Sequence, residues 1–451
     1  MKRETCGQLR SAAAFLFVVF SRALPAQQTA QPPMAASQND MSQMDMSHMA
    51  MGGPGTNEAT AFLTSESSGT SFQPSAWPMP MLMTSVDDWQ LMWMGQAFIA
   101  DTQQSGPRGG DKFYSTNWGM LSATHRLGRG AVMLRAMLSL EPATVTGRRY
   151  PLLFQTGETA FGKPIVDGQH PHDLFMEISV QYAHPLSENS TWDVYYAPVG
   201  EPALGPTPYP HRTSAMEFPQ ATLGHHWEDS THIANNVLTT GVTYRKVRLE
   251  ASGFYGREPN ENRWNIDFGR MDSWSTRLSF YPTPNWAAQV STGLLHNPEA
   301  ATPGDVLRTT ASVEYITPRH GGNSWATSFV WGQDEKRNEA RRVNAVLAET
   351  VYPIGRKNFL TGRYEWSQRD ELFSNDPVAA QQAAEATAQE AFNVNALTLG
   401  YTRDIALVSK LESGLGANIS TYVIDSALQP FYGSHPWGIN VFARFRLKAS
   451  H

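Results

Sequence analysis

The fold is decided by one stretch of sequence, Trp274-Ser-Thr-Arg-Leu-Ser-Phe-Tyr281, then Pro-Thr-Pro-Asn, then Trp286-Ala-Ala-Gln-Val-Ser-Thr-Gly-Leu294. Side chains alternate between the two faces of an extended strand. Apolar residues therefore share one face of the first segment and polar residues share the other: Trp274, Leu278 and Phe280 against Ser275, Arg277 and Ser279. The alternation repeats after the proline-bounded turn. A soluble sandwich shows the same pattern, so the number of strands and the lengths of their connections have to separate the two folds.

The same alternation recurs along most of the chain, in residues 174–182, 247–253, 360–366 and 439–448. In the last of these segments, Arg444, Arg446 and Lys448 share a face whose charges need water, while Ile439 and Val441 share an apolar face. Segments of about ten residues with one apolar and one polar face are typical of transmembrane β-strands. We therefore predict an all-β fold, a transmembrane antiparallel β-barrel.

We predict about sixteen strands, an even number as in single-chain bacterial barrels. Their centres fall near residues 94, 119, 135, 178, 194, 241, 251, 277, 290, 313, 328, 347, 363, 398, 415 and 442. The expected connections alternate between short turns, as at residues 282–285, and longer loops, as at residues 198–235 and 333–342. Short turns face the periplasm in this class of protein and long loops face outward, so the alternation predicts the direction of every strand.

The start of the chain predicts export. Lys2 and Arg3 precede an apolar run over about residues 12–20, and small residues at Ala23 and Ala26 offer a cleavage site, the layout of a secretory signal. Roughly ten apolar residues are too few to cross a hydrocarbon core of about 30 Å. The single cysteine, Cys6, would leave with the signal, so we expect no disulfide and no cysteine-ligated metal in the mature chain.

The chain divides into three expected parts. We expect a signal peptide over residues 1–26, a disordered Met-rich arm in the periplasm over residues 27–85, and the outer-membrane β-barrel over residues 86–451. The mildly acidic balance, a formal net charge of −6, gives no reason to expect nucleic acid as a partner.

Thioethers are concentrated in the arm. The candidate metal ligands there are Met41, Met44, Met46, His48, Met49 and Met51. Soft sulfur suits Cu(I), and imidazole is a compatible partner. The tract lacks the aromatic and β-branched residues of a core, which leaves a linker with incidental methionines or a site that captures copper or silver; we favour capture. Met92 and Met94, inside the first strand, are expected to face lipid or fill gaps.

Histidines in the predicted outer loops form a second set of candidate metal ligands. They are His170, His172, His225, His226 and His232. Imidazole with carboxylate is a common ligand set for Zn²⁺ or Cu²⁺, and in an extended run His170 and His172 would point to the same face. The alternative is that these loops fold inward and the histidines hydrogen-bond a constriction, because long loops have many backbone polar groups to satisfy.

Charged side chains are predicted to point into the barrel. They are Arg245, Arg248, Glu250, Arg277, Glu314, Arg363, Glu365, Arg444 and Arg446. In a water-filled lumen such charges tune ion selectivity, whereas in an occluded barrel they would pair with one another. About sixteen strands usually leave a channel, which favours a pore.

A secretory signal, a tract mixing Met with Asp, Ser and His, and then a barrel resemble the bacterial copper-resistance outer-membrane proteins of the B-component type. The specific part of the likeness covers residues 34–51. The resemblance implies that the arm's Met and His residues are copper ligands. The segment Gly168-Gln-His-Pro-His-Asp173 also resembles one found in uncharacterised bacterial outer-membrane proteins, which implies no activity.

We therefore expect a porin-like outer-membrane barrel that handles metal ions, with copper export, sequestration or resistance as the favoured role and copper ions as the expected bound species. The alternatives are a general or solute-selective porin without a metal role, and a plugged structural or surface-interaction barrel. Recognisable catalytic motifs such as Gly-x-Ser-x-Gly and His-Glu-x-x-His are missing, so no enzyme is expected. The expected partners are outer-membrane lipid and metal ions or small solutes, and a homotrimer is left open.

Overall fold

A closed antiparallel β-barrel is the body of the protein. The computed structural model describes residues 57–77, 79–229, 234–318, 323–387, 391–407 and 411–448, and sixteen strands within these residues form the barrel. They are β2 (Trp89–Gln104), β3 (Asp111–Leu127), β4 (Gly130–Leu138), β7 (Phe175–Ser187), β8 (Ser190–Gly200), β9 (Ala234–Tyr244), β10 (Val247–Tyr255), β11 (Ser273–Phe280), β12 (Trp286–Leu295), β13 (Val306–Pro318), β14 (Ser324–Lys336), β15 (Arg341–Ile354), β16 (Asn358–Arg369), β17 (Phe392–Ile405), β18 (Leu411–Ile424) and β19 (Trp437–Leu447). Each contains one of the sixteen predicted centres, so the fold class and the strand count are confirmed.

Each strand pairs with its neighbour in the chain, and β19 closes the sheet by pairing with β2. Phe442 lies opposite Ala100 at this seam. The rest of that edge of β2 pairs with β1 (Leu82–Val86), where Met83 lies opposite Met92. Closure matters because lipid offers no hydrogen-bond partner to a free strand edge.

The two faces of the wall follow the predicted alternation. Along β11 every second residue is buried, with Arg277 at 5% exposure between Thr276 and Leu278, which are exposed. Trp274, Leu278 and Phe280 are 45–47% exposed on the outside. Apolar residues point outward and polar residues inward, the reverse of a soluble sandwich and the arrangement of a barrel in lipid.

An aromatic ladder crosses neighbouring strands near one rim. Trp286 contacts Tyr315 with ring centroids 4.6 Å apart, and Trp325 lies 5.8 Å from both Tyr315 and Tyr352. These residues lie on β12 to β15, close to the short turns. Such a girdle is typical of the level where a membrane barrel meets the lipid headgroups.

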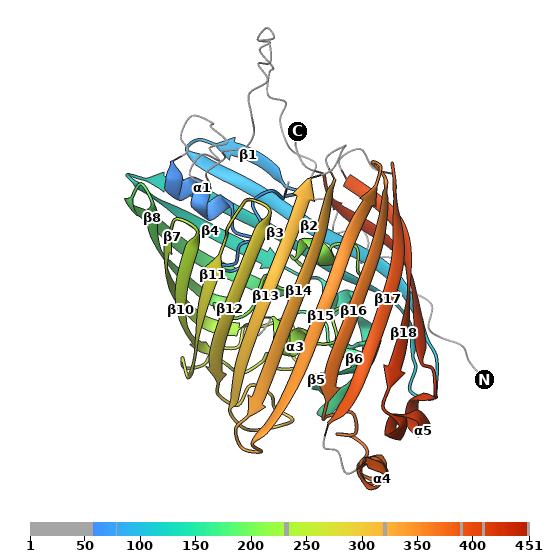
Figure 1. The fold of residues 1–451 in the computed structure, drawn as a ribbon. Coiled ribbons are helices and arrows are strands. Elements are labelled where there is room, and N and C mark those ends of the chain that lie inside the picture. Colours follow the sequence, from blue (N-terminus) through green and yellow to red (C-terminus); the bar gives the residue numbers. More distant parts are fainter. Residues whose placement is uncertain are drawn as a thin grey trace, which may run out of the picture. The chain divides into compact units, whose positions relative to one another are not determined.

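Short and long connections alternate as predicted (Figure 1). Residues 128–129 and 188–189 are turns at one end, whereas residues 201–233 and 256–272 connect strands at the other. The long-loop end carries α4 (Pro377–Thr387) and α5 (Gln429–Tyr432). Residues 337–340 are shorter than the loop expected at 333–342, because β14 and β15 pair as far as Lys336 and Arg341. No helix in the described part of the chain is long and apolar enough to cross a membrane.

Residues 57–77 and 79–85 include a helix and most of a strand, so the expectation of a disordered arm over residues 27–85 is wrong for these described residues. Helix α1 (Glu58–Thr64) begins with the Asn57 side chain accepting a hydrogen bond from the amide of Thr60 at 2.8 Å. Leu63 packs on Met133 of the inner wall, and Phe62 lies under the guanidinium of Arg248 at 5.0 Å. The apolar face of α1 is covered by the wall, which stabilises the helix. Residues 1–56 lie outside the described residues.

Loop residues fill the lumen. Every residue from 201 to 229 is buried except Pro210, and this stretch, here called the lumen loop, contains a 3₁₀ turn (Thr213–Ala215) and α3 (His225–Glu228). A hairpin of β5 (Tyr150–Ala160) and β6 (Lys163–Gln169) follows the short helix α2 (Glu141–Thr144) and a 3₁₀ turn (Thr146–Arg148), and much of the hairpin is buried as well. A last 3₁₀ turn (Ser426–Leu428) precedes α5. Figure 1 shows α3 inside the ring of strands.

Candidate metal centre in the lumen

Most of the predicted inward-pointing charges form ion pairs, which favours one of the two predicted arrangements. Arg277 Nε lies 2.8 Å from Glu250, and Arg248 Nη1 lies 2.8 Å from Asp193. Arg363 pairs with Glu349 at 3.0 Å, and Arg444 pairs with Glu217 of the lumen loop. Six of the nine predicted inward charges, Arg248, Glu250, Arg277, Arg363, Arg444 and Arg446, are therefore paired as expected of an occluded barrel, rather than lining the open pore that the strand count favoured. The number of strands determines the width of the barrel, but it does not determine whether loops fold into the lumen.

Arg245 was predicted to point inward and does not. It lies in the turn between β9 and β10, with a φ of 52°, and its side chain is exposed. The turn breaks the period-two pattern at this residue.

The lumen loop is tied to the wall by a fully buried arginine. Arg212 has 0% exposure and pairs with Asp229 of its own loop at 3.0 Å and with Glu349 of β15 at 2.7 Å. Ser214 donates to the same Glu349 carboxylate at 2.8 Å. Charge-assisted hydrogen bonds of this kind are the strong ones, so they hold the loop in one position across the lumen.

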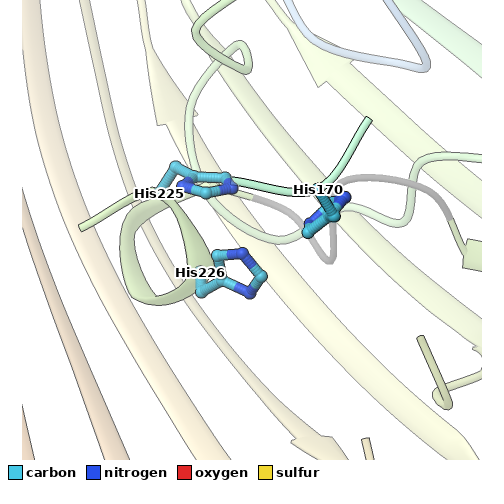
Figure 2. Close-up of side chains that lie close together, drawn as sticks. All are labelled: His170, His225 and His226. Atoms are coloured by element: carbon cyan, nitrogen blue, oxygen red, sulfur yellow. The ribbon is translucent and has the colours of Figure 1, made fainter. Parts of the chain in front are cut away.

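Three of the predicted histidines meet in the lumen (Figure 2). His225 and His226 lie side by side on α3, with ring centroids 4.1 Å apart, and His170 lies opposite them on the segment after β6. Ligand atoms of the three rings all lie within 4.8 Å of one another. His170 and His225 are 2% and 0% exposed, and His226 is 5% exposed. Burial lowers the pKa of His170 well below its usual value, and the nearby His226 lowers it further, so His170 is a neutral imidazole at pH 7.

Glycines allow this close packing. A Cβ at Gly157 would lie 2.7 Å from Cε1 of His226, and Gly157 has a φ of +126° that favours glycine. A Cβ at Gly332 of β14 would lie 2.1 Å from the carbonyl oxygen of Trp227, so the glycine lets α3 approach the wall closely at this point. These two positions bring the histidines against the hairpin on one side and the barrel on the other.

Carboxylates surround the three rings. Glu158 Oε1 lies 3.2 Å from Nε2 of His170, and Glu258 Oε1 lies 3.3 Å from Nδ1 of His226. Glu258 and Glu299 form a second group with His226 whose ligand atoms also lie within 4.8 Å of one another. Imidazole nitrogens beside carboxylate oxygens form a donor set that suits Zn²⁺ or Cu²⁺.

His172 is not part of this group. Its Nδ1 lies 3.0 Å from Glu141 of α2, and its backbone amide donates to the same carboxylate at 2.8 Å. The expectation that His170 and His172 share a face assumed an extended strand, but residues 170–173 are not in a strand. The remaining candidates, His232 in the loop and Met41, Met44, Met46, His48, Met49 and Met51 in the arm, lie outside the described residues.

The sequence left open whether Met92 and Met94 face lipid or fill gaps, and it did not predict that other methionines gather with them inside the barrel. Met92 and Met94, expected to face lipid or fill gaps, are 1% and 4% exposed on the inner side and pack with Met120, Met137 and Met176. Met79 and Met81 of the N-terminal segment pack against this cluster. The period-two pattern of β2 could have indicated their inward position, because Met92, Met94 and Gln96 lie on the same face of the strand and Gln96 is polar.

His211 of the lumen loop lies at the border of that cluster. It is 3% exposed, its ring lies 4.2 Å from that of Trp118, and neither ring nitrogen has a hydrogen-bond partner among the described residues. Met94 and Met216 line the same small cavity. Burial, with the neighbouring His172 and Arg135 adding to it, lowers the pKa of His211 to about 3, which keeps its imidazole neutral.

Comparison with known proteins supports the fold and no narrower assignment. No protein-family model matches the chain, and no curated protein matches its sequence. Among solved structures, it is similar to OprB of Pseudomonas putida, with 10% identity, a TM-score of 0.51, and 80% of this chain and 94% of that chain covered. It is also similar to an anion-selective porin of Comamonas acidovorans, with 10% identity, a TM-score of 0.48, and 80% of this chain and 100% of that chain covered. The outer-membrane channel DcaP of Acinetobacter baumannii is similar too, with 10% identity, a TM-score of 0.47, and 81% of this chain and 99% of that chain covered.

The chain therefore has the fold of an outer-membrane β-barrel of the porin type. The resemblance to the copper-resistance family holds at the level of this fold, and none of the matches supports membership of that family.

Proposed function

We propose that this protein is a porin-like channel of the bacterial outer membrane, held closed at rest by the lumen loop. One observation carries the proposal: a barrel of sixteen strands is wide enough for an aqueous channel, and the buried lumen loop, anchored by Arg212 to Glu349, occupies that space. Small solutes or ions would pass when the loop moves. A permanently plugged structural barrel is the competing interpretation.

The topology supports the outer membrane as the location, with the arm in the periplasm. Residue Asn57 contacts the turn between β3 and β4 through hydrogen bonds of its side chain to the carbonyls of Arg129 and Gly130, both at 3.1 Å. Short turns face the periplasm in this class, so the preceding arm would enter the barrel from that side. A homotrimer stays a prediction, as does the absence of enzymatic activity; crosslinking and sedimentation in detergent would test the first.

Single-channel recording in a planar bilayer tests the channel. The wild-type protein should conduct little, whereas a variant in which residues 206–222 are replaced by a short Gly-Ser linker should conduct in steps typical of an open barrel. Arg342→Met, which changes an exposed side chain at the start of β15, is the matched control and should behave as the wild type. If the shortened variant folds by heat-modifiable gel mobility and still conducts no more than the wild type, the channel proposal fails.

A second candidate function is the handling of soft metal ions such as Cu(I), and His211 favours it. A buried imidazole with no hydrogen-bond partner, beside the thioethers of Met94 and Met216, offers the nitrogen and sulfur donors that Cu(I) takes. The arm's methionines would supply further ligands. Cu(I) affinity is measured by competition with a chromogenic Cu(I) chelator. A variant in which five methionines are replaced together by Leu should bind Cu(I) more weakly than the wild type; they are Met41, Met44, Met46, Met49 and Met51. Adding His211→Phe to this variant should weaken Cu(I) binding further. Equal Cu(I) binding by these variants and the wild type would leave copper without support.

A further inference from the structure

Four separate segments of the chain meet at the histidine cluster. His170 lies between β6 and β7, and His225 and His226 lie on α3 of the lumen loop. Glu258 and Glu299 come from the outer connections at residues 256–272 and 296–305. A ligand held here would therefore connect the lumen loop to segments that lie outside it in the chain.

The hydrogen bonds of the three rings orient them for a common ligand. Nδ1 of His170 lies 3.0 Å from the carbonyl of Pro171, and Nδ1 of His225 lies 3.0 Å from the carbonyl of Thr222. Nδ1 of His226 faces the Glu258 carboxylate at 3.3 Å. For His226, the Glu258 acceptor at Nδ1 favours the tautomer whose Nε2 carries the lone pair, which is how histidine ligands of metals are usually held. Nδ1 of His225 also lies 3.2 Å from Nε2 of Gln155, and Nε2 of His170 lies 3.2 Å from Glu158, so an ion bound at Nε2 of His170 would replace the Glu158 contact.

We propose that His170, His225 and His226 form a binding site for one divalent transition-metal ion, such as Zn²⁺, Co²⁺ or Cu²⁺, with Glu258 orienting His226. A tetrahedral ion with bonds of about 2.0–2.1 Å places its ligand nitrogens about 3.3 Å apart. The ligand atoms lie within 4.8 Å of one another, so the rings need to close by at most about 1.5 Å. The three histidines leave the fourth position of the ion for water or a small solute ligand.

The residues around the site favour a divalent transition-metal ion over other ions. Glu258 lies 3.3 Å from His226 and offsets part of the positive charge of the ion, whereas Glu158, beside His170, is also paired with Arg263. Ca²⁺ and Mg²⁺ require six or more oxygen ligands and are disfavoured by imidazole. Cu(I) prefers thioether or thiolate sulfur, which distinguishes this site from the His211 cavity.

The bound ion would also act on the channel. Because α3 belongs to the lumen loop and His170 does not, the ion joins the loop to the segment that precedes β7 and stabilises the closed state. This second part rests on the proposed channel function, whereas metal binding itself does not.

Metal binding is measured on the full-length protein in detergent after treatment with a chelator. Co²⁺ should produce the visible absorption of a tetrahedral nitrogen-ligated ion, with about one ion per chain, and Zn²⁺ should displace it. His226→Gln and His170→Gln should each abolish that absorption. Glu258→Gln should weaken binding by about 10–100-fold, as is usual when a group that orients a ligand is removed.

His435→Ala is the matched control, because His435 is exposed in an outer loop. It should bind Co²⁺ as the wild type does, and gel mobility before and after heating reports the folding of every variant. Wild-type absorption in both His226→Gln and His170→Gln overturns the site, as does an equal loss in His435→Ala.

Channel recordings separate the two parts of the proposal. Zn²⁺ should lower the frequency of openings of the wild type and leave His226→Gln unaffected. If Co²⁺ binds as described but Zn²⁺ leaves the openings of the wild type unchanged, the link to the loop is wrong and the site stands. If the variant in which residues 206–222 are replaced does not conduct, the proposed channel function is wrong, whether or not the protein binds metal.

Discussion

The wall of the barrel and the lumen loop bury their residues for different reasons. In β11 every second side chain is exposed, and in β12 the outward-facing side chains are exposed or half-buried; Val290 and Leu278, which lie opposite each other, are 49% and 45% exposed. In the lumen loop nearly every residue is buried whatever its polarity, including Arg212 and Glu228. The wall is stabilised by backbone hydrogen bonds and lipid, whereas the loop depends on specific ion pairs with the wall.

The largest expected effect comes from removing the anchor of the loop. Arg212→Met should lower the free energy of unfolding by about 3–5 kcal/mol, because it leaves the buried carboxylates of Asp229 and Glu349 with one partner fewer. Urea unfolding from lipid vesicles, followed by tryptophan fluorescence, measures it. Arg342→Met removes an exposed pair with Glu335 and should cost about 0–1 kcal/mol. Similar costs at the two sites would mean that the loop is not anchored by its buried charge.

A charge on the lipid face should have the next largest effect. Val290→Arg places a guanidinium against hydrocarbon and should cost about 2–4 kcal/mol near the bilayer midplane. The preceding residue, Gln289, lines a small lumen cavity together with Glu314, so Gln289→Arg should be tolerated better. The same unfolding assay compares them. A greater cost for Gln289→Arg than for Val290→Arg would reverse the two faces of the wall.

A smaller effect should depend on pH. Burial raises the pKa of Glu201, at the start of the lumen loop, to about 8, and the nearby Glu177 carboxylate raises it further. A carboxyl that holds its proton more tightly in the folded state stabilises the fold below its ordinary value of 4.5, and this contribution is lost as the pH rises toward 8. Glu201→Gln should therefore flatten the decline in unfolding free energy over this range. An unchanged pH slope would show that Glu201 is ionised in the folded protein.

The smallest effect is expected from single cysteine substitutions, which report only which loop residues are accessible to a labelling reagent. Lys163→Cys, in the exposed turn region of the β5–β6 hairpin, should react with an impermeant maleimide on intact cells. Ala221→Cys in the lumen loop, 2% exposed in the wild type, should react only after denaturation. Thr283→Cys, in a short turn, should react once the outer membrane is made permeable. Rapid labelling of Ala221→Cys on intact cells would place the loop outside the lumen.

Much of the wall could be predicted from the sequence, because the alternation of side chains is local. The stretch 274–294 predicted β11, its turn and β12, and the contrast of Leu278 with Arg277 predicted which face meets lipid. The candidate site could be predicted only in part. His170, His225 and His226 were recognised as candidate ligands, but the pairing of His170 with His172 was wrong because Pro171 lies in an irregular segment.

The sequence by itself determined the barrel, its strand directions and the residue types available for binding metal, since each follows from patterns within about twenty neighbouring residues. Only the tertiary structure decided that the lumen is filled and that His170 meets His226. Those contacts join residues far apart in the chain, such as Arg212 and Glu349, which are 137 positions apart. Local periodicity carries no information about such pairs, because their energy depends on burial and charge partners that exist only after the barrel has closed.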